Sequence, residues 1–96
     1  MTLKKDDELK NELYEAFLKL ETQEETEKFL ADLCTIKEIE SMCQRLKAAK
    51  MLLAGKTYNE IVEETEISSA TLARVSKCVH YGNGGYKTVI NKPKKS

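Results

Sequence analysis

Apolar residues recur at intervals of three or four along most of this 96-residue chain, which is the spacing of one face of an α-helix. The first such stripe predicts a helix over about residues 6–20 and consists of Leu9, Leu13, Phe17 and Leu20. The second predicts a helix that ends near residue 33 and consists of Phe29, Leu30 and Leu33. Because the first helix is otherwise charged, its stripe needs a surface to pack against, which a partner subunit can supply as well as the chain itself.

Three segments begin with Thr and carry Glu three residues later, the capping box that starts helices: Thr22–Glu25, Thr35–Glu38 and Thr57–Glu60. Thr35 therefore opens a third helix, which Gly55 ends as an expected left-handed cap. This helix is roughly 28 Å long, at about 1.5 Å per residue. Its apolar residues cover more than one narrow stripe, so we expect it to be the central core helix, buried on two sides.

The third capping box opens a short helix that runs from Thr57 to about residue 64. Residues 65–67 form a short connection, and Ser68 or Ser69 caps a further helix that continues to about residue 80. Two short helices joined by about three residues are typical of a helix-turn-helix. The apolar side of the second helix should face the third and fourth helices through Leu72, Val75 and Val79.

The second helix of this motif begins with small and hydroxyl side chains, which let a helix approach the base edges in a major groove about 12 Å wide. Ser and Thr hydroxyls can donate hydrogen bonds to phosphates or bases, and two basic residues follow on the same helix. The predicted DNA-binding residues are Thr57, Tyr58, Asn59, Ser68, Ser69, Ala70, Thr71, Ala73, Arg74 and Lys77. The alternative is an ordinary helical hairpin with a polar outer face, since short motifs produce many false positives.

The chain is long enough for one domain and too short for two. Strong helix formers dominate its first 54 residues, and its one proline is Pro93, so we predict an all-α domain over residues 1–90. Within it, residues 6–54 should form a dimer core and residues 57–80 the helix-turn-helix. A brief last turn should contain Tyr86, Val89 and Ile90 after the glycine-rich run at 81–85, and residues 91–96 should form a basic, disordered tail.

The zero net charge hides a division of charge between the two parts of the chain. Residues 1–40 carry six Lys and twelve acidic residues, a net charge of −6, whereas residues 41–96 carry ten basic residues and four Glu, a net charge of +6. No acidic residue follows Glu66. Only the second part is therefore suited to face a polyanion such as DNA. The alternative is that its basic residues simply form a solvated tail.

Other kinds of site find little support in the sequence. The three cysteines, Cys34, Cys43 and Cys78, fit no disulfide or zinc pattern, so we expect reduced thiols in the core of a cytoplasmic protein, and no metal. The single His80 borders a flexible loop, and no nucleophile and base can be paired, which argues against an enzyme. The longest apolar stretch is far too short to span a bilayer, so no membrane partner is expected.

Three blocks at residues 33–46, 52–61 and 69–74, together with Cys-Val-His-Tyr-Gly-Asn at 78–83, resemble the Trp repressor superfamily and, within it, the YerC/YecD branch. The resemblance extends over about residues 5–90. It implies a Trp-repressor-like helical homodimer, in which the two subunits intertwine. It also implies a bacterial transcriptional regulator, with a repressor the expected kind, that reads double-stranded DNA with a recognition helix at about 69–80.

In tryptophan-binding members of that superfamily one Thr and two Arg side chains shape the corepressor pocket, and the resemblance places Thr35, Arg45 and Arg74 at those positions. Val75 and Cys78 stand where those members have Gly and Ser, so a β-branched side chain and a thiol would fill or depolarise the pocket. We therefore expect no tryptophan binding and no other cofactor, and any small-molecule effector stays unidentified. Thr35 also suits a helix cap, and Arg45 could pair with acids of the first two helices.

Glu66 stands in the turn of the motif where the family usually has Gly. If that position needs a positive φ, a side chain there costs roughly 1 kcal/mol. The carboxylate is also unfavourable beside a helix that faces DNA. A second hypothesis is therefore a helical protein-interaction adaptor that has kept the dimer core and lost DNA affinity.

Overall fold

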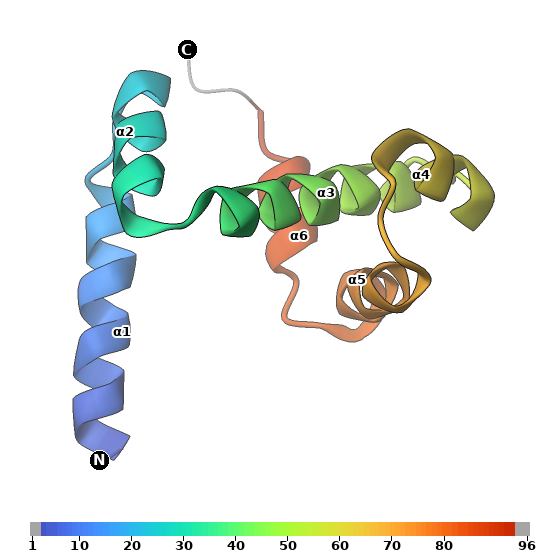
Figure 1. The fold of residues 1–96 in the computed structure, drawn as a ribbon. Coiled ribbons are helices and arrows are strands. Elements are labelled where there is room, and N and C mark those ends of the chain that lie inside the picture. Colours follow the sequence, from blue (N-terminus) through green and yellow to red (C-terminus); the bar gives the residue numbers. More distant parts are fainter. Residues whose placement is uncertain (1–2, 94–96) are drawn as a thin grey trace. The chain divides into compact units, whose positions relative to one another are not determined.

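The computed structural model describes residues 3–93, which form six helices: α1 (Leu3–Leu18), α2 (Gln23–Leu33), α3 (Ile36–Leu53), α4 (Tyr58–Thr65), α5 (Ser69–Tyr81) and α6 (Gly85–Ile90) (Figure 1). No strand occurs among these residues, which confirms the all-α prediction. The chain divides into two compact units, Met1–Ile36 and Lys37–Ser96. The first unit contains α1 and α2, and the second contains α3 to α6 apart from the first residue of α3.

In the first unit, α1 begins three residues before the predicted start and ends at Leu18, two residues before the predicted end. It ends early because the last amides bond three residues back, from Lys19 N to the Ala16 carbonyl (3.2 Å) and from Leu20 N to the Phe17 carbonyl (3.1 Å). Such bonds tighten the final turn of a helix and close it.

The packing within this unit is light. The rings of Phe17 in α1 and Phe29 in α2 meet edge to face, with centroids 5.5 Å apart and planes at 83°. None of residues 5–36 is buried, so the unit has no closed core of its own. The α2 start is as predicted, because Thr22 Oγ1 accepts a hydrogen bond from Glu25 N at 3.1 Å. The Glu25 carboxylate accepts from Glu21 N at 2.8 Å, one residue earlier than a capping box requires.

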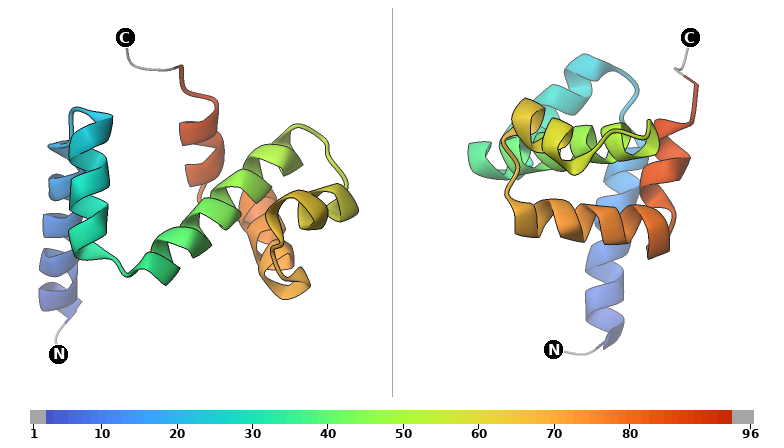
Figure 2. Two further views of the ribbon diagram at one scale, coloured as in Figure 1. Left: turned by 45° about the horizontal axis from the view of Figure 1, so that its top comes forward. Right: turned by 90° about the vertical axis from the view of Figure 1, so that its right-hand side faces the viewer.

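The second unit contains a closed apolar core, around which α3, α4, α5 and α6 are arranged (Figure 2). Its largest fully buried side chains are Ile61, Leu72 and Val75. The other buried members are Ala48, Ala49, Met51, Ile67 and Val79. The two alanines of α3 present little side chain, so the neighbouring helices can approach its backbone closely.

The burial of α3 within the single chain is confined to its second half, and burial on two sides stays a prediction. Only Ala48, Ala49 and Met51 are buried, because the core lies against the second half of the helix. Leu46, in the middle of the helix, is 40% exposed. The predicted end of the helix is confirmed: Gly55 has φ +84°, and Lys56 N donates to the Met51 carbonyl at 3.0 Å.

The last helix is longer than the predicted brief turn. α6 has six residues, and two of them, Tyr86 and Ile90, pack against the core. Asn91 N and Lys92 N close its end by donating to the carbonyls of residues 87 and 89. The remainder of the predicted tail, residues 94–96, lies outside the described residues.

The three cysteines are unpaired thiols, but the expectation that they are core residues is wrong for two of them. Cys43 and Cys78 are exposed, and Cys34 is half-buried. Within residues 3–93, no group of three or more Cys, His, Asp or Glu side chains is placed to hold a metal ion. None of the helices in the described chain combines the length and the hydropathy that a bilayer-spanning segment needs.

Candidate nucleic-acid interface

Two short helices, α4 and α5, are joined by Glu66, Ile67 and Ser68, and this is the spacing that the sequence predicted for a helix-turn-helix (Figure 1). α4 begins with a complete capping box: Thr57 Oγ1 accepts from Glu60 N at 3.2 Å, and Glu60 Oε1 accepts from Thr57 N at 2.9 Å. The bond from the Thr57 amide to the ionised carboxylate, together with the adjacent Thr57 hydroxyl, holds the pKa of Glu60 below its ordinary value of 4.5.

The burial pattern of α5 fixes which of its sides faces outward. Leu72, Val75 and Val79 are buried in the core beside Ile61 of α4 and the alanines of α3, as predicted. Their spacing defines one stripe of the helix, so residues on the opposite side are turned away from the unit. The recognition edge, which we define as Ser69, Ala70, Ala73, Arg74 and Lys77, is exposed along its whole length.

The first turn of α5 is capped by Ser68. Its hydroxyl oxygen accepts a hydrogen bond from Thr71 N at 3.2 Å and donates to Thr71 Oγ1 at 2.8 Å. The Ser68 hydroxyl is therefore committed to the helix, whereas the Thr71 hydroxyl keeps its own hydrogen for donation. Of the predicted hydroxyl contacts, Ser69 and Thr71 are the better placed to reach a ligand.

The two basic side chains of the recognition edge are free to bind a ligand. Neither Arg74 nor Lys77 makes a hydrogen bond or an ion pair with another residue in the part of the chain that the structure describes. An ion pair between Lys28 and Glu24, at 3.6 Å, lies in the other unit. The recognition edge thus presents two unneutralised positive charges beside small side chains.

The predicted contacts at the start of α4 are also exposed. Thr57 is used as the cap, and its hydroxyl and backbone amide both bond to Glu60. Tyr58 and Asn59 follow in the first turn, with Tyr58 49% exposed. The amides of a first helical turn lack partners within their own helix, so this end of α4 suits an anionic group.

Glu66 adopts the left-handed conformation that the sequence analysis considered, with φ 59° and ψ 20°. It is the one residue other than glycine with positive φ in the described chain. Its N–H donates to the Val62 carbonyl at 2.9 Å, which closes α4 as a left-handed cap. The turn thus has the shape that glycine usually provides, with a carboxylate exposed on it.

Three residues that hold the turn in place were not recognised from sequence. Gln44 Nε2 in α3 donates to the Thr65 carbonyl at 3.1 Å, and Thr65 Oγ1 accepts from Ile67 N at 3.2 Å. Ile67 is 2% exposed and anchors the connection in the core. The burial of Ile67 could have been predicted, because it is a single apolar residue between two polar ones in the turn. The bond from Gln44 to Thr65 could not, because these residues are far apart in sequence.

The three residues that the resemblance indicated for a corepressor site do not all belong to one unit, so their grouping stays a prediction. Arg45 Nε donates to the Ser41 carbonyl in its own helix at 3.4 Å. Arg74 is exposed on the recognition edge, and Thr35 belongs to the other unit. Val75 is 2% exposed and fills space in the core that glycine would leave empty.

Cys78 lies instead in an open apolar groove of about 440 Å³ between α3, α5 and α6. The groove is lined by Leu46, Cys78, Gly82, Asn83, Gly85, Tyr86 and Val89.

Comparisons with known proteins agree with this geometry. The family model described as "Trp repressor protein" matches residues 8–94. The uncharacterized protein YerC of Bacillus subtilis (strain 168) is 43% identical over 86 residues, which cover 90% of this chain and 83% of the relative. Among solved structures, a proposed Trp repressor from Staphylococcus aureus superposes with a TM-score of 0.82 at 43% identity, over 84% of this chain and 81% of the other.

A TrpR-like protein from Eubacterium eligens ATCC 27750 gives a TM-score of 0.81 at 43% identity, over 84% of each chain. The sequence match and the fold therefore agree on one family over almost the whole chain. This chain belongs to the Trp repressor family, whose members are regulatory DNA-binding proteins with a helix-turn-helix and not enzymes.

Proposed function

We propose that this protein is a cytoplasmic, sequence-specific repressor of transcription that binds DNA as a homodimer. The first turns of α5 would enter the major groove, with Ser69, Ala70, Thr71 and Ala73 against base edges and Arg74 and Lys77 on bases or phosphates. The observation that carries the proposal is the recognition edge itself, which is exposed, small or basic, and unpaired within its unit.

The exposed apolar surface of the chain supports a homodimer. α1 exposes a stripe that includes Leu9 (54%), Leu13 (39%) and Phe17 (41%), and the second unit carries the apolar groove lined by Leu46 and Val89. Burying such side chains stabilises a protein by about 1.5–3 kcal/mol each, so both surfaces favour association with a second copy. Two recognition helices in a symmetric dimer would meet successive major grooves about 34 Å apart.

Charge favours DNA as the partner of the second unit. Lys37–Ser96 carries eleven basic and six acidic residues, a net charge of +5, whereas Met1–Ile36 carries five Lys and ten acids, a net charge of −5. A dimer that neutralises phosphates releases counterions, so its affinity should fall steeply with added salt.

A direct test begins with selection of binding sites from random DNA by the full-length protein. The selected duplex should then bind the Arg74→Ala/Lys77→Ala variant at least tenfold more weakly, because each lost bidentate or phosphate contact removes about 1–3 kcal/mol. The matched control is Lys10→Ala/Lys28→Ala, which removes the same charge from exposed positions of the acidic unit. Equal losses in both variants would show a general charge effect and contradict recognition by α5.

The spacing of the selected sites tests the dimer. Selected sequences should contain two half-sites about 10 base pairs apart, centre to centre. Inserting about five base pairs moves the second half-site to the opposite side of the duplex and should remove most of the affinity. Sedimentation equilibrium should give twice the chain mass of 10.9 kDa at the protein concentrations used for binding.

The interaction adaptor remains the second candidate, because the Glu66 carboxylate lies on the turn directly before the recognition helix. A negative charge there opposes the approach of phosphates. Failure of the wild-type protein to enrich any sequence from random DNA, together with a stable dimer, would favour the adaptor over the repressor.

A further inference from the structure

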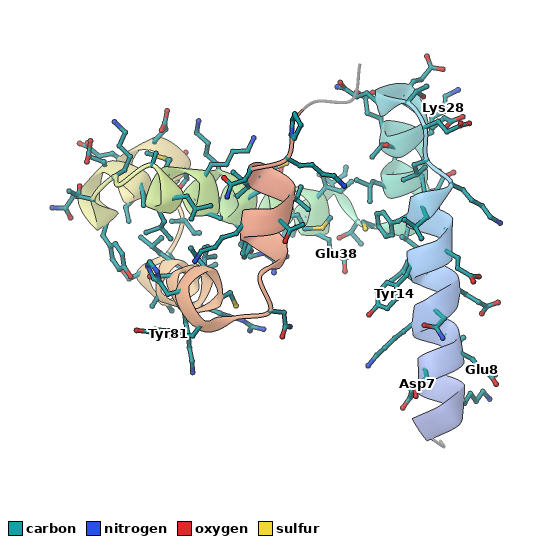
Figure 3. All side chains as sticks on the ribbon, turned by 180° about the vertical axis from the view of Figure 1, so that it is seen from behind. Asp7, Glu8, Tyr14, Lys28, Glu38 and Tyr81 are labelled. Atoms are coloured by element: carbon teal, nitrogen blue, oxygen red, sulfur yellow. The ribbon has the colours of Figure 1, made fainter. Side chains whose placement is uncertain are left out.

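The last residue of α5, Tyr81, is the most exposed large apolar side chain among the described residues, at 86%. Figure 3 shows its side chain projecting from α5, and the family resemblance implies no role for it. We infer that Tyr81 is a further DNA contact, whose hydroxyl donates a hydrogen bond to a backbone phosphate on the far wall of the groove that α5 enters. The inference rests on the proposed DNA-binding function.

The position of Tyr81 around the helix supports this contact. Residues 70, 74, 77 and 81 follow at intervals of four, three and four, so they share one face of α5. That face lies opposite the buried stripe of Leu72, Val75 and Val79. Tyr81 therefore continues the face that carries Arg74 and Lys77, and a duplex lying on those two residues passes over Tyr81 as well.

The position along the helix selects the phosphate backbone over the bases. From Ser69 to Tyr81 the helix advances about 18 Å, at about 1.5 Å per residue. The major groove is only about 12 Å wide, so a helix that enters with its first turn has its last turn at the sugar–phosphate wall. A phenolic hydroxyl is a good donor to a phosphate oxygen, and no acidic residue of the chain follows Glu66 to repel that phosphate.

The local structure keeps the Tyr81 side chain outward. The His80 and Tyr81 rings lie edge to face, with centroids 6.2 Å apart. The helix ends at the next residue, where Gly82 N donates to the Cys78 carbonyl at 2.9 Å. A Cβ on Gly82 would lie 2.4 Å from that carbonyl oxygen, so only glycine allows this close approach. The chain thus turns away directly after Tyr81 and adds no side chain that would cover it.

The experiment compares the wild-type protein with Tyr81→Ala and Tyr81→Phe on the duplex selected by the wild type. Removing one hydrogen bond to phosphate should weaken binding by roughly three- to tenfold in both variants. The dependence of affinity on salt should keep its slope, because Tyr81 is uncharged and releases no counterion. Lys77→Ala should instead lower the slope by about 0.9 per recognition helix. Thr88→Ala, an exposed change on α6, is the control and should bind like the wild type.

The melting temperature of both Tyr81 variants should equal that of the wild type, since the side chain is almost fully exposed. Wild-type affinity in both variants, with a loss in Lys77→Ala, would overturn the inference and leave the proposed function intact. A loss of affinity in Tyr81→Ala with wild-type affinity in Tyr81→Phe would also overturn it, because the hydroxyl would then contribute nothing to binding. If the wild-type protein binds no duplex, the proposed function fails and the inference fails with it.

Discussion

Replacing Glu66 by Gly should make the protein more stable, because the backbone there adopts a conformation that side chains disfavour. The residue has φ 59° and ψ 20°. A side chain in the left-handed region costs about 1–2 kcal/mol relative to glycine. Glycine also gives the unfolded chain more freedom, which offsets about 0.4–1 kcal/mol of the gain. The middle values of these two ranges predict that the free energy of unfolding rises by roughly 0.8 kcal/mol.

The size of this effect depends on the turn keeping its shape in the variant. Ile67 is buried and Gln44 holds the Thr65 carbonyl, so the residues on both sides of Glu66 are fixed. The Glu66 N–H donates to the Val62 carbonyl whatever the side chain, and glycine preserves that bond. Because the turn cannot relax into another conformation, the wild-type chain must carry the strain, and the variant loses it.

Glu66→Ala is the matched control for this variant. It removes the carboxylate as Glu66→Gly does, but it keeps the Cβ and hence the strain. Thermal unfolding followed by circular dichroism should show Glu66→Gly melting about 2–8 °C above Glu66→Ala, at one fixed protein concentration. Equal melting temperatures for the two variants would refute the claim that strain is stored at this turn.

The same pair of variants measures the cost of the charge. Both remove a negative charge next to the recognition helix, so both should bind the selected duplex more tightly than the wild type, and by the same factor. A gain confined to the glycine variant would instead assign the effect to the shape of the turn.

Four further outcomes are expected. Thr57→Ala should lower the free energy of unfolding by about 1 kcal/mol, measured by urea denaturation, because it removes the cap of α4. The amide and hydroxyl of Thr57 hold the Glu60 pKa low, so the stability that these bonds contribute is present above pH 4.5 and is lost as the pH falls through the lowered pKa; Glu60→Gln, which cannot ionise, should show a weaker pH dependence between neutral pH and that range, and an unchanged one would contradict the assignment. Leu72→Ala should lower the free energy of unfolding by about 2–5 kcal/mol and abolish duplex binding, since Leu72 is fully buried and positions α5; binding at wild-type affinity would show that α5 is not the recognition helix. Saturating L-tryptophan should change neither the melting temperature nor the affinity for DNA, because we expect the buried Val75, which stands where tryptophan-binding members of the family have Gly, to leave no room for an indole; a rise in melting temperature with tryptophan concentration would contradict this.

Local signals in the sequence were sufficient for most of the fold. The capping boxes at Thr22 and Thr57 start helices at the following residues, because each cap is settled by atoms no more than four residues apart. Gly55 ends α3 for the same reason. The stripe of Leu72, Val75 and Val79 was enough to orient α5, since a helix of known phase has only one apolar side to bury.

The features that were not foreseen depend on contacts between distant residues. α6 is a helix because Tyr86 and Ile90 find a core to pack against, which a glycine-rich local sequence does not reveal. The limited burial of α3 follows from how far α4 and α5 extend along it, a property of the tertiary arrangement. The positions of the site residues were predictable from the helical period, but the bond from Gln44 to Thr65 and the commitment of Ser68 to its cap were not.

The two units of the chain differ both in burial and in charge, and this difference suggests how each would contribute to DNA binding. The second unit closes a core of eight buried residues and carries the excess of basic residues, so it can hold α5 rigidly against a polyanion. None of residues 5–36 is buried, and the first unit carries the excess of acidic residues and leaves its apolar stripe exposed, with Asp7, Glu8 and Tyr14 projecting from α1 (Figure 3). Helices with so little packing of their own are marginal in water, so in the proposed dimer α1 and α2 would gain stability from association. In the proposed dimer the acidic unit would supply the contact between copies while its charge discourages DNA from binding there. DNA would then bind at α5. The first unit, which would not touch DNA, would set the distance between the two recognition helices of the dimer.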